Sequence, residues 1–111
     1  MGIREQQDLL DRHEISVKEL TECYLNRIET YDPALQSYIT VTKEQAYQNA
    51  ETAQKKIDDG TAAPLCGIPL AIKDNICTDG VRTTCASKML EDFIPPYNAT
   101  VMEKLNAQNA V

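Results

Sequence analysis

The sequence predicts an α/β fold in which amphipathic helices pack on a β-sheet. The strand signal is the run of residues 70–72, which is apolar at every position and is opened by Gly67 and Pro69. Such runs are typical of strands that are buried on both faces at the centre of an α/β sheet. Helix signals occur before and after this run, within 111 residues that suit one small domain.

The first predicted helix begins after Ser16. Ser16 and Glu19 match a capping box, in which the two side chains accept hydrogen bonds from amides at a helix start. Apolar residues then recur at helical spacing and form one stripe, made of Val17, Leu20, Tyr24, Ile28 and Tyr31. A stripe of this kind either faces the core or forms a groove for a partner, and we favour the core. Asp32-Pro33 is expected to end the helix.

The second predicted helix begins at a second capping-box pattern, Thr42 to Gln45. Its narrow face carries small residues that allow close packing, and it includes Ala46, Ala50, Ala53 and Ile57. Residues 58–60 read Asp-Asp-Gly and form the stop signal. Residues 35–41, between the two helices, are expected to be a short extended segment.

A tight turn and a last helix are predicted after the apolar run. Asp79-Gly80 is a turn signal, and Ser87 is placed at a helix N-terminus. Residues 95–96 are both proline and predict a stiff connection. The last helix is expected to be capped near Thr100 and to carry Val101, Met102 and Leu105.

Composition excludes several classes of function. The net charge of −6, with charges of both signs interspersed, disfavours direct binding of nucleic acid, which requires a basic patch. No apolar run approaches the roughly 20 residues that cross a bilayer, so no membrane segment is expected. The charged N-terminus lacks the apolar core of a signal peptide, so we expect a cytoplasmic protein. Its four cysteines then read as free thiols, and their spacing does not suit a zinc site.

Lys73 is the candidate for chemistry. It follows the apolar run at once, and the carboxyl ends of strands are where ligands and catalytic groups gather in α/β folds. Burial there would favour the neutral amine, which is able to accept a proton. The alternative from the pattern alone is a solvated charge at the end of a strand.

Three segments resemble the amidase signature family. They are residues 67–75, residues 80–87 and residues 95–100, and the likeness extends from Ile3 to Val111. Within that family the sequence is most similar to the glutamine-hydrolysing subunits of tRNA-dependent amidotransferases. The family pattern has Asp at position 98 and Gly at position 109, where this chain has Asn98 and Asn109. Asparagine caps helices and adopts positive φ, so both departures are compatible with the fold.

The resemblance implies a catalytic triad of a serine, a second serine in a cis peptide bond, and a lysine, which it places at Lys73. The family's serines lie in a downstream Gly/Ser-rich loop, whereas this chain has only Ser16, Ser37 and Ser87. We therefore expect residues 1–111 to be the N-terminal part of one amidase domain whose helices pack on a mixed β-sheet, incomplete here. Residues 1–64 would form a helical segment, and residues 65–111 the signature strand, turn and helix.

The resemblance also implies partners and cofactors. Glutamine would be the substrate, and ammonia would pass to a partner subunit. The partners would be subunits B and C of the amidotransferase, with tRNA bound indirectly through the complex. No cofactor is expected in this chain, and ATP and Mg would belong to the partner subunit. Two alternatives remain, a stand-alone amidase for small amides and a non-catalytic interaction module. The roles of Asp74, Asn75 and Arg82 stay open, with a turn favoured for Asp74 and a surface position for Arg82.

Overall fold

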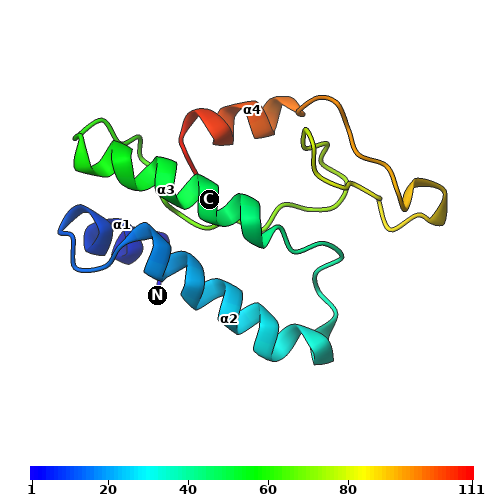
Figure 1. Ribbon diagram of the computed structural model, residues 1–111, viewed down its shortest axis with the longest axis horizontal. Helices are drawn as coiled ribbons and strands as arrows, with labels where there is room; N and C mark the ends of the chain where they lie inside the picture. The colour runs from blue at the N-terminus through cyan, green and yellow to red at the C-terminus, as the bar shows by residue number, and fades with distance from the viewer.

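The computed structural model describes residues 1–111 and contains four α-helices, one short 3-10 helix and no β-strand. The α-helices are α1 (Ile3–Asp11), α2 (Val17–Leu35), α3 (Lys43–Asp58) and α4 (Thr100–Ala107), and the 3-10 helix η1 spans Lys88–Leu90. Helices α2 and α3 pack side by side and run in opposite directions (Figure 1). No helix is both long enough and apolar enough to span a membrane.

The core lies where the first three helices meet the chain that follows α3. Its buried residues are Leu10, Val17, Leu20, Ala50, Ala53, Ile57, Cys66 and Ile68. The predicted small-residue face of α3 is confirmed, because Ala50 and Ala53 are almost completely buried. Alanine at these positions lets the backbones of α2 and α3 approach closely. The signature segment, residues 67–75, therefore begins against a helical hairpin.

The start of α2 forms as predicted, but its apolar stripe is only partly covered. The Ser16 hydroxyl accepts a hydrogen bond from the Glu19 amide at 3.1 Å, and the Glu19 carboxylate accepts one from the Ser16 amide at 2.8 Å. Hydrogen bonds from Ser16 lower the pKa of Glu19, with the Ser16 amide as the main cause. Val17 and Leu20 are buried, whereas Tyr31 is 53% exposed. Only the N-terminal half of the stripe faces the core.

One predicted helix boundary and one predicted cap were wrong. Helix α2 continues through Pro33 to Leu35 and ends at Gln36, which has a left-handed φ of 54°. Pro33 lies in the last turn, where losing its single amide donor breaks little of the helical ladder. At α3 the helix begins at the predicted place, but Thr42 makes no side-chain cap, so the second capping box does not form.

Helix α1 was not predicted from the sequence pattern. It begins after Gly2, whose amide donates to the Glu5 carboxylate at 2.6 Å. Leu10 brings it to the core, and Gln6 is buried although it is polar. The Gln6 amide group donates to the Tyr24 hydroxyl at 2.8 Å, which joins α1 to α2.

The predicted strand at residues 70–72 is not formed among residues 1–111. A strand needs a paired neighbour, and the only partner available here is Val111. The Leu70 amide donates to the Val111 carbonyl at 2.7 Å, and the Val111 amide donates to the Ile68 carbonyl at 3.0 Å. This alternation is the hydrogen-bond pattern of parallel neighbours. Ala71 and Ile72 lie beyond the pair and are exposed, so the predicted burial is also absent.

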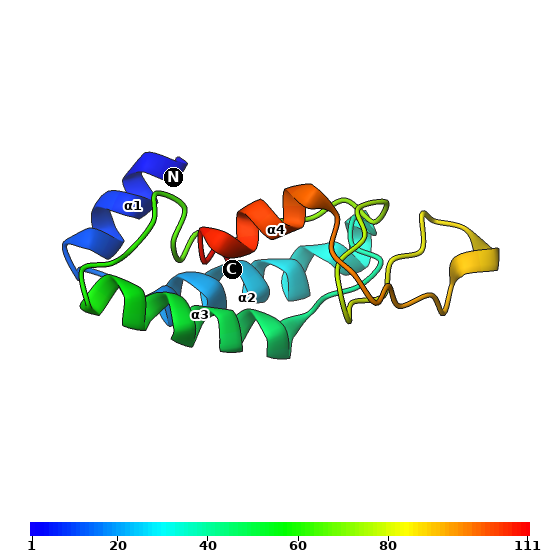
Figure 2. The same cartoon turned by 90° about the horizontal axis from the view of Figure 1, so that it is seen from above.

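Residues 78–97 form a loop region that extends away from the helices, with η1 at its far end (Figures 1 and 2). The predicted turn is confirmed, because Thr78 and Val81 form an antiparallel bridge around Gly80 at a φ of 72°. Ser87 caps η1 by accepting from the Met89 amide at 3.3 Å, so the predicted helix start at Ser87 is also confirmed.

The two asparagines that depart from the family pattern fit their positions. The Asn98 side chain accepts a hydrogen bond from the Asp79 amide at 2.8 Å, which links the turn to the residues before α4. Asn109 has a φ of 55° and follows the end of α4. Asparagine tolerates this left-handed conformation better than most residues. Helix α4 itself has Ala99 rather than Thr100 at its cap position.

Candidate functional site

Lys73 projects from the molecule near the end of the signature segment. Its side chain is exposed, and the burial that was predicted for it is not supplied by residues 1–111. Its main chain is fixed, because the Lys73 carbonyl accepts a hydrogen bond from the Ile76 amide at 3.0 Å. The lysine is thus an unobstructed amine on a defined turn.

Asp74, the next residue of this turn, joins the turn to a loop that lies farther along the chain. Its carboxylate accepts hydrogen bonds from the Thr84 amide at 2.9 Å, from the Thr84 hydroxyl, and from the Ala86 amide at 3.3 Å. Its main-chain carbonyl accepts from the Cys85 amide at 2.8 Å. Three consecutive amides therefore converge on one residue. The turn predicted for Asp74 was an incomplete account, because the carboxylate binds residues far along the chain.

The loop wound around Asp74 has an unusual backbone. Cys85 and Ala86 both have a φ of 53°, a left-handed conformation that costs free energy for residues other than glycine. Thr84 is buried beside the carboxylate. Hydrogen bonds from the Thr84 hydroxyl, then from the Thr84 and Ala86 amides, lower the pKa of Asp74, and the nearby charge of Arg82 acts in the same direction. Asp74 is therefore held as a carboxylate.

The N-terminal end of the signature segment packs against core residues of α1 and α2. Gly67 has a φ of 77°, and its amide donates to the Asn109 carbonyl at 3.0 Å. A Cβ atom at this position would lie 2.8 Å from a methyl group of Val17 and 3.3 Å from one of Leu10. Only glycine satisfies both the backbone conformation and the close approach.

The remaining polar residues near the lysine are not drawn into the site. Arg82 is exposed, and its Nε donates to the Glu91 carbonyl within the same loop region, as a surface role predicts. Asn75 is exposed. The importance of Thr84 was not predicted, although the segment that contains it was expected near the lysine. No local pattern marks Thr84, because its partner Asp74 lies 10 residues earlier.

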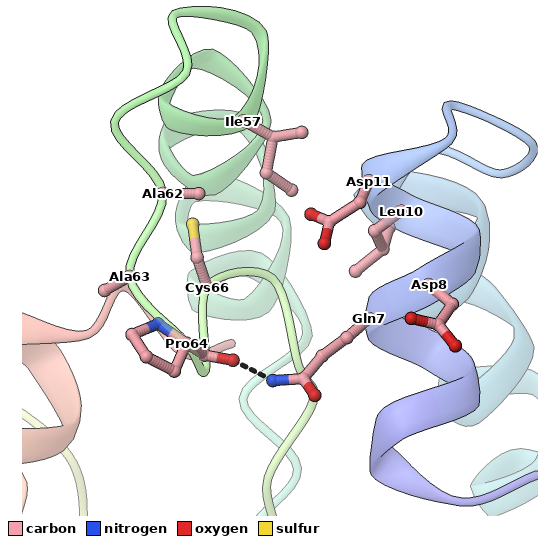
Figure 3. A pocket seen from close by; sticks show the side chains of 9 residues that line it. All are labelled: Gln7, Asp8, Leu10, Asp11, Ile57, Ala62, Ala63, Pro64 and Cys66. Atoms are coloured by element: carbon pink, nitrogen blue, oxygen red, sulfur yellow. Dashed lines mark hydrogen bonds between the residues drawn. The ribbon is translucent and has the colours of Figure 1, made fainter.

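A cavity of about 300 Å³ lies elsewhere, between α1 and the chain that follows α3 (Figure 3). Its lining includes Asp8 and Asp11 from α1 and Cys66 from the opposite wall, and Gln7 bridges the two sides by donating to the Pro64 carbonyl. No group of His, Cys, Asp and Glu residues is arranged to hold a metal ion. This cavity does not include Lys73.

The four cysteines are free thiols, and the one in the cavity wall is the least reactive by environment. The Cys66 sulfur lies 3.5 Å from the Ala53 carbonyl, and burial raises the pKa of the thiol. A raised pKa keeps the thiol protonated, and a protonated thiol is a poor nucleophile.

The comparison with known proteins decides the family. A family model described as Amidase matches residues 19–111. The chain belongs to the amidase family. This confirms the resemblance that residues 67–100 carry.

Relatives of the chain within the amidase family have a consistent name. The chain is 58% identical over 111 residues to the A subunit of glutamyl-tRNA(Gln) amidotransferase from Ruminiclostridium cellulolyticum. It is 54% identical over 111 residues to the protein of that name from Desulfosudis oleivorans, and each match covers 100% of this chain. Each match covers only 23% of the relative, so the chain spans about a quarter of the length of these relatives.

A solved structure shares this arrangement of helices. It comes from work on a vestigial protein complex that reveals the origins of an s-triazine catabolic enzyme. It matches 100% of this chain and 25% of that chain, with a TM-score of 0.94 and 25% sequence identity. An inhibitor-bound form of the same complex gives a TM-score of 0.93.

Proposed function

We propose that residues 1–111 are the N-terminal part of the glutamine-hydrolysing subunit of a tRNA-dependent amidotransferase. The observation that carries this proposal is the 58% identity, over the whole chain, to the A subunit of glutamyl-tRNA(Gln) amidotransferase. In the complete enzyme, glutamine would release ammonia, and partner subunits would use ATP and Mg to amidate Glu-tRNA(Gln) or Asp-tRNA(Asn). The B and C subunits would supply the tRNA contact that this acidic chain is poorly suited to make.

Lys73 would act as the general base of a Ser-cisSer-Lys triad. The neutral amine accepts a proton from the cis serine, which in turn activates the nucleophilic serine for attack on the amide. Both serines would come from a Gly/Ser-rich loop beyond residue 111. The free Lys73 side chain on a fixed turn is compatible with this role, because no hydrogen bond or ion pair within residues 1–111 occupies it.

A neutral lysine requires a drier environment than residues 1–111 provide. We infer that the chain beyond Val111 continues as a strand parallel to residues 68–72 and contributes to a mixed sheet. The alternating hydrogen bonds between Val111 and residues 68 and 70 support this register. Pairing along this edge would cover Ile72 and remove water from the base of Lys73.

The test uses the complete polypeptide with its partner subunits and measures ammonia release from glutamine. Lys73→Ala is expected to lower turnover by about 10²- to 10⁴-fold while the melting curve is retained. Lys73→Arg is expected to fail as well, because arginine stays protonated. Lys88→Ala, at an exposed lysine in η1, is the matched control and should retain activity. Turnover of the Arg variant at the wild-type rate would contradict the neutral-lysine mechanism.

A stand-alone amidase for small amides is the second candidate, because the match to a family model described only as Amidase fits either function. The two functions are separated by substrate. An amidotransferase forms amidated tRNA from glutamine and ATP when its partners are present, whereas a stand-alone amidase hydrolyses small amides without them. In either case the isolated 111-residue chain is expected to release no ammonia, because it would contain the base without the nucleophile.

A further inference from the structure

Asp74 combines two structural relations. It adjoins Lys73 in sequence, and it receives the amides of residues 84, 85 and 86 through its carboxylate and its carbonyl. Because Asp74 makes these bonds with both its side chain and its main chain, rotation of its side chain alone does not release the loop. The main chain from which Lys73 projects is thereby attached to the loop at residues 84–86.

The loop in turn depends on Asp74. Cys85 and Ala86 hold left-handed conformations that L-residues rarely adopt, so surrounding contacts have to stabilise them. The contacts at hand are the carboxylate of Asp74 and the Thr84 hydroxyl, which accepts from the Ala86 amide at 3.1 Å. A carboxylate that receives backbone amides in this way forms strong, charge-assisted hydrogen bonds. Removing the carboxylate would leave the Asp74 carbonyl and the Thr84 hydroxyl as the remaining partners of the Cys85 and Ala86 amides, so the loop would be held less firmly.

We propose that Asp74 is a positioning residue for Lys73, acting by fixing the turn at residues 73–76 against the loop at residues 84–86. This rests on the proposed function, in which Lys73 is the general base. Asp74 makes no contact with the amine itself; it sets the direction in which the lysine leaves the backbone. A displacement of about 1 Å at a reacting group lowers turnover by about 10²-fold, so a small shift of this turn is sufficient to matter.

The variants remove, in steps, the hydrogen bonds that join Asp74 to residues 84–86, which we call the anchor. Asp74→Ala removes the carboxylate, whereas Asp74→Asn keeps one oxygen for the Thr84 amide and turns an NH2 group toward the Ala86 amide. Thr84→Val removes the hydroxyl, and Thr84→Ser restores it. Asp79→Asn is the matched control, because Asp79 is an exposed acid in the nearby turn. All variants are made in the complete polypeptide.

Three measurements are made on each variant. Hydrogen exchange of the amides at residues 84–86 reports the anchor. Steady-state kinetics with glutamine report turnover and KM. The rate of Lys73 acylation by sulfosuccinimidyl acetate, relative to that of Lys88, reports the accessibility and reactivity of the Lys73 amine. We expect Asp74→Ala to speed exchange, to lower kcat by about 10²-fold with KM little changed, and to alter the Lys73 acylation rate. Asp74→Asn and Thr84→Val should show smaller losses, and Thr84→Ser should match the wild type.

The outcomes separate the two proposals. Faster exchange at residues 84–86 with unchanged kcat and unchanged Lys73 acylation would overturn the positioning role and leave Asp74 as a structural anchor only. Unchanged exchange would overturn it as well. A wild-type protein that hydrolyses no amide would refute the proposed function, while an altered Lys73 acylation rate in Asp74→Asn would still support positioning.

Discussion

Replacing Gly67 with alanine should destabilise the fold far more than the loss of one glycine would suggest. The left-handed conformation of Gly67 costs an alanine about 1–2 kcal/mol. The added Cβ would also lie 2.8 Å from a Val17 methyl group, in a core position where Val17 is fully buried. Overpacking of this kind costs about 1–3 kcal/mol. Together they give a loss of about 2–5 kcal/mol in the free energy of unfolding.

Gly80 provides the matched control for this experiment. It has a similar φ of 72°, but a Cβ atom there would have no neighbour within 4 Å. Gly80→Ala should therefore cost only the conformational part, about 1–2 kcal/mol. Urea unfolding of the complete protein, followed by circular dichroism, measures the difference between the two variants. A third variant, Gly67→Ala with Val17→Ala, makes room for the Cβ and should lose less than the sum of its parts.

The steric argument has a clear refutation. If Gly67→Ala and Gly80→Ala lower the free energy of unfolding equally, the contact with Val17 carries no cost. If the double variant is additive, the clash is also absent. Either result would show that Gly67 is required for its conformation alone.

Three other expectations concern acid, thiols and the isolated chain. Because the pKa of Asp74 is lowered in the folded protein, its hydrogen bonds to residues 84–86 should be intact above the ordinary carboxyl pKa of about 3.9. They should be lost as pH falls through the lowered value. Amides of residues 84–86 that exchange at neutral pH as fast as unprotected amides would contradict this. Exposed Cys23 and Cys85 should react with a thiol reagent well before buried Cys66, and equal rates in the native protein would refute the burial of Cys66. The isolated 111-residue chain should self-associate or bind an apolar dye, because Tyr31 and several apolar side chains of the loop region are exposed. A monodisperse monomer with a sharp thermal transition and no dye binding would count against this.

The parts of the fold that were predictable depend on residues close in sequence. The cap at Ser16 needs only Glu19, and the turn at Gly80 needs only its immediate neighbours. The small face of α3 follows from the spacing of alanines along one helix. In each case the interacting groups lie close together along the chain, so the local pattern contains the whole cause.

The parts that were not predictable depend on partners far along the chain. Nothing in the sequence near Asp74 indicates that Thr84 will donate to it, and both side chains suit an ordinary turn. The strand at residues 70–72 was expected from its apolar pattern, but pairing requires a neighbour, and only Val111 is present to supply one. Helix α1 was missed because its cap is a glycine and its buried face includes the polar Gln6.

The separation between local and distant contacts has a consequence for the order of folding. Helices α2 and α3 form a hairpin whose contacts connect neighbouring parts of the chain, and contacts of this kind form quickly. The hairpin can begin with contacts beside its connecting loop and close progressively, whereas the pairing of Val111 with residues 68 and 70 has no such nearby starting contact and should form later. On a ribosome, the N-terminal hairpin would emerge first and could fold while the rest of the polypeptide is still being synthesised. The helices would then serve as the template on which the segment carrying Lys73 is laid down.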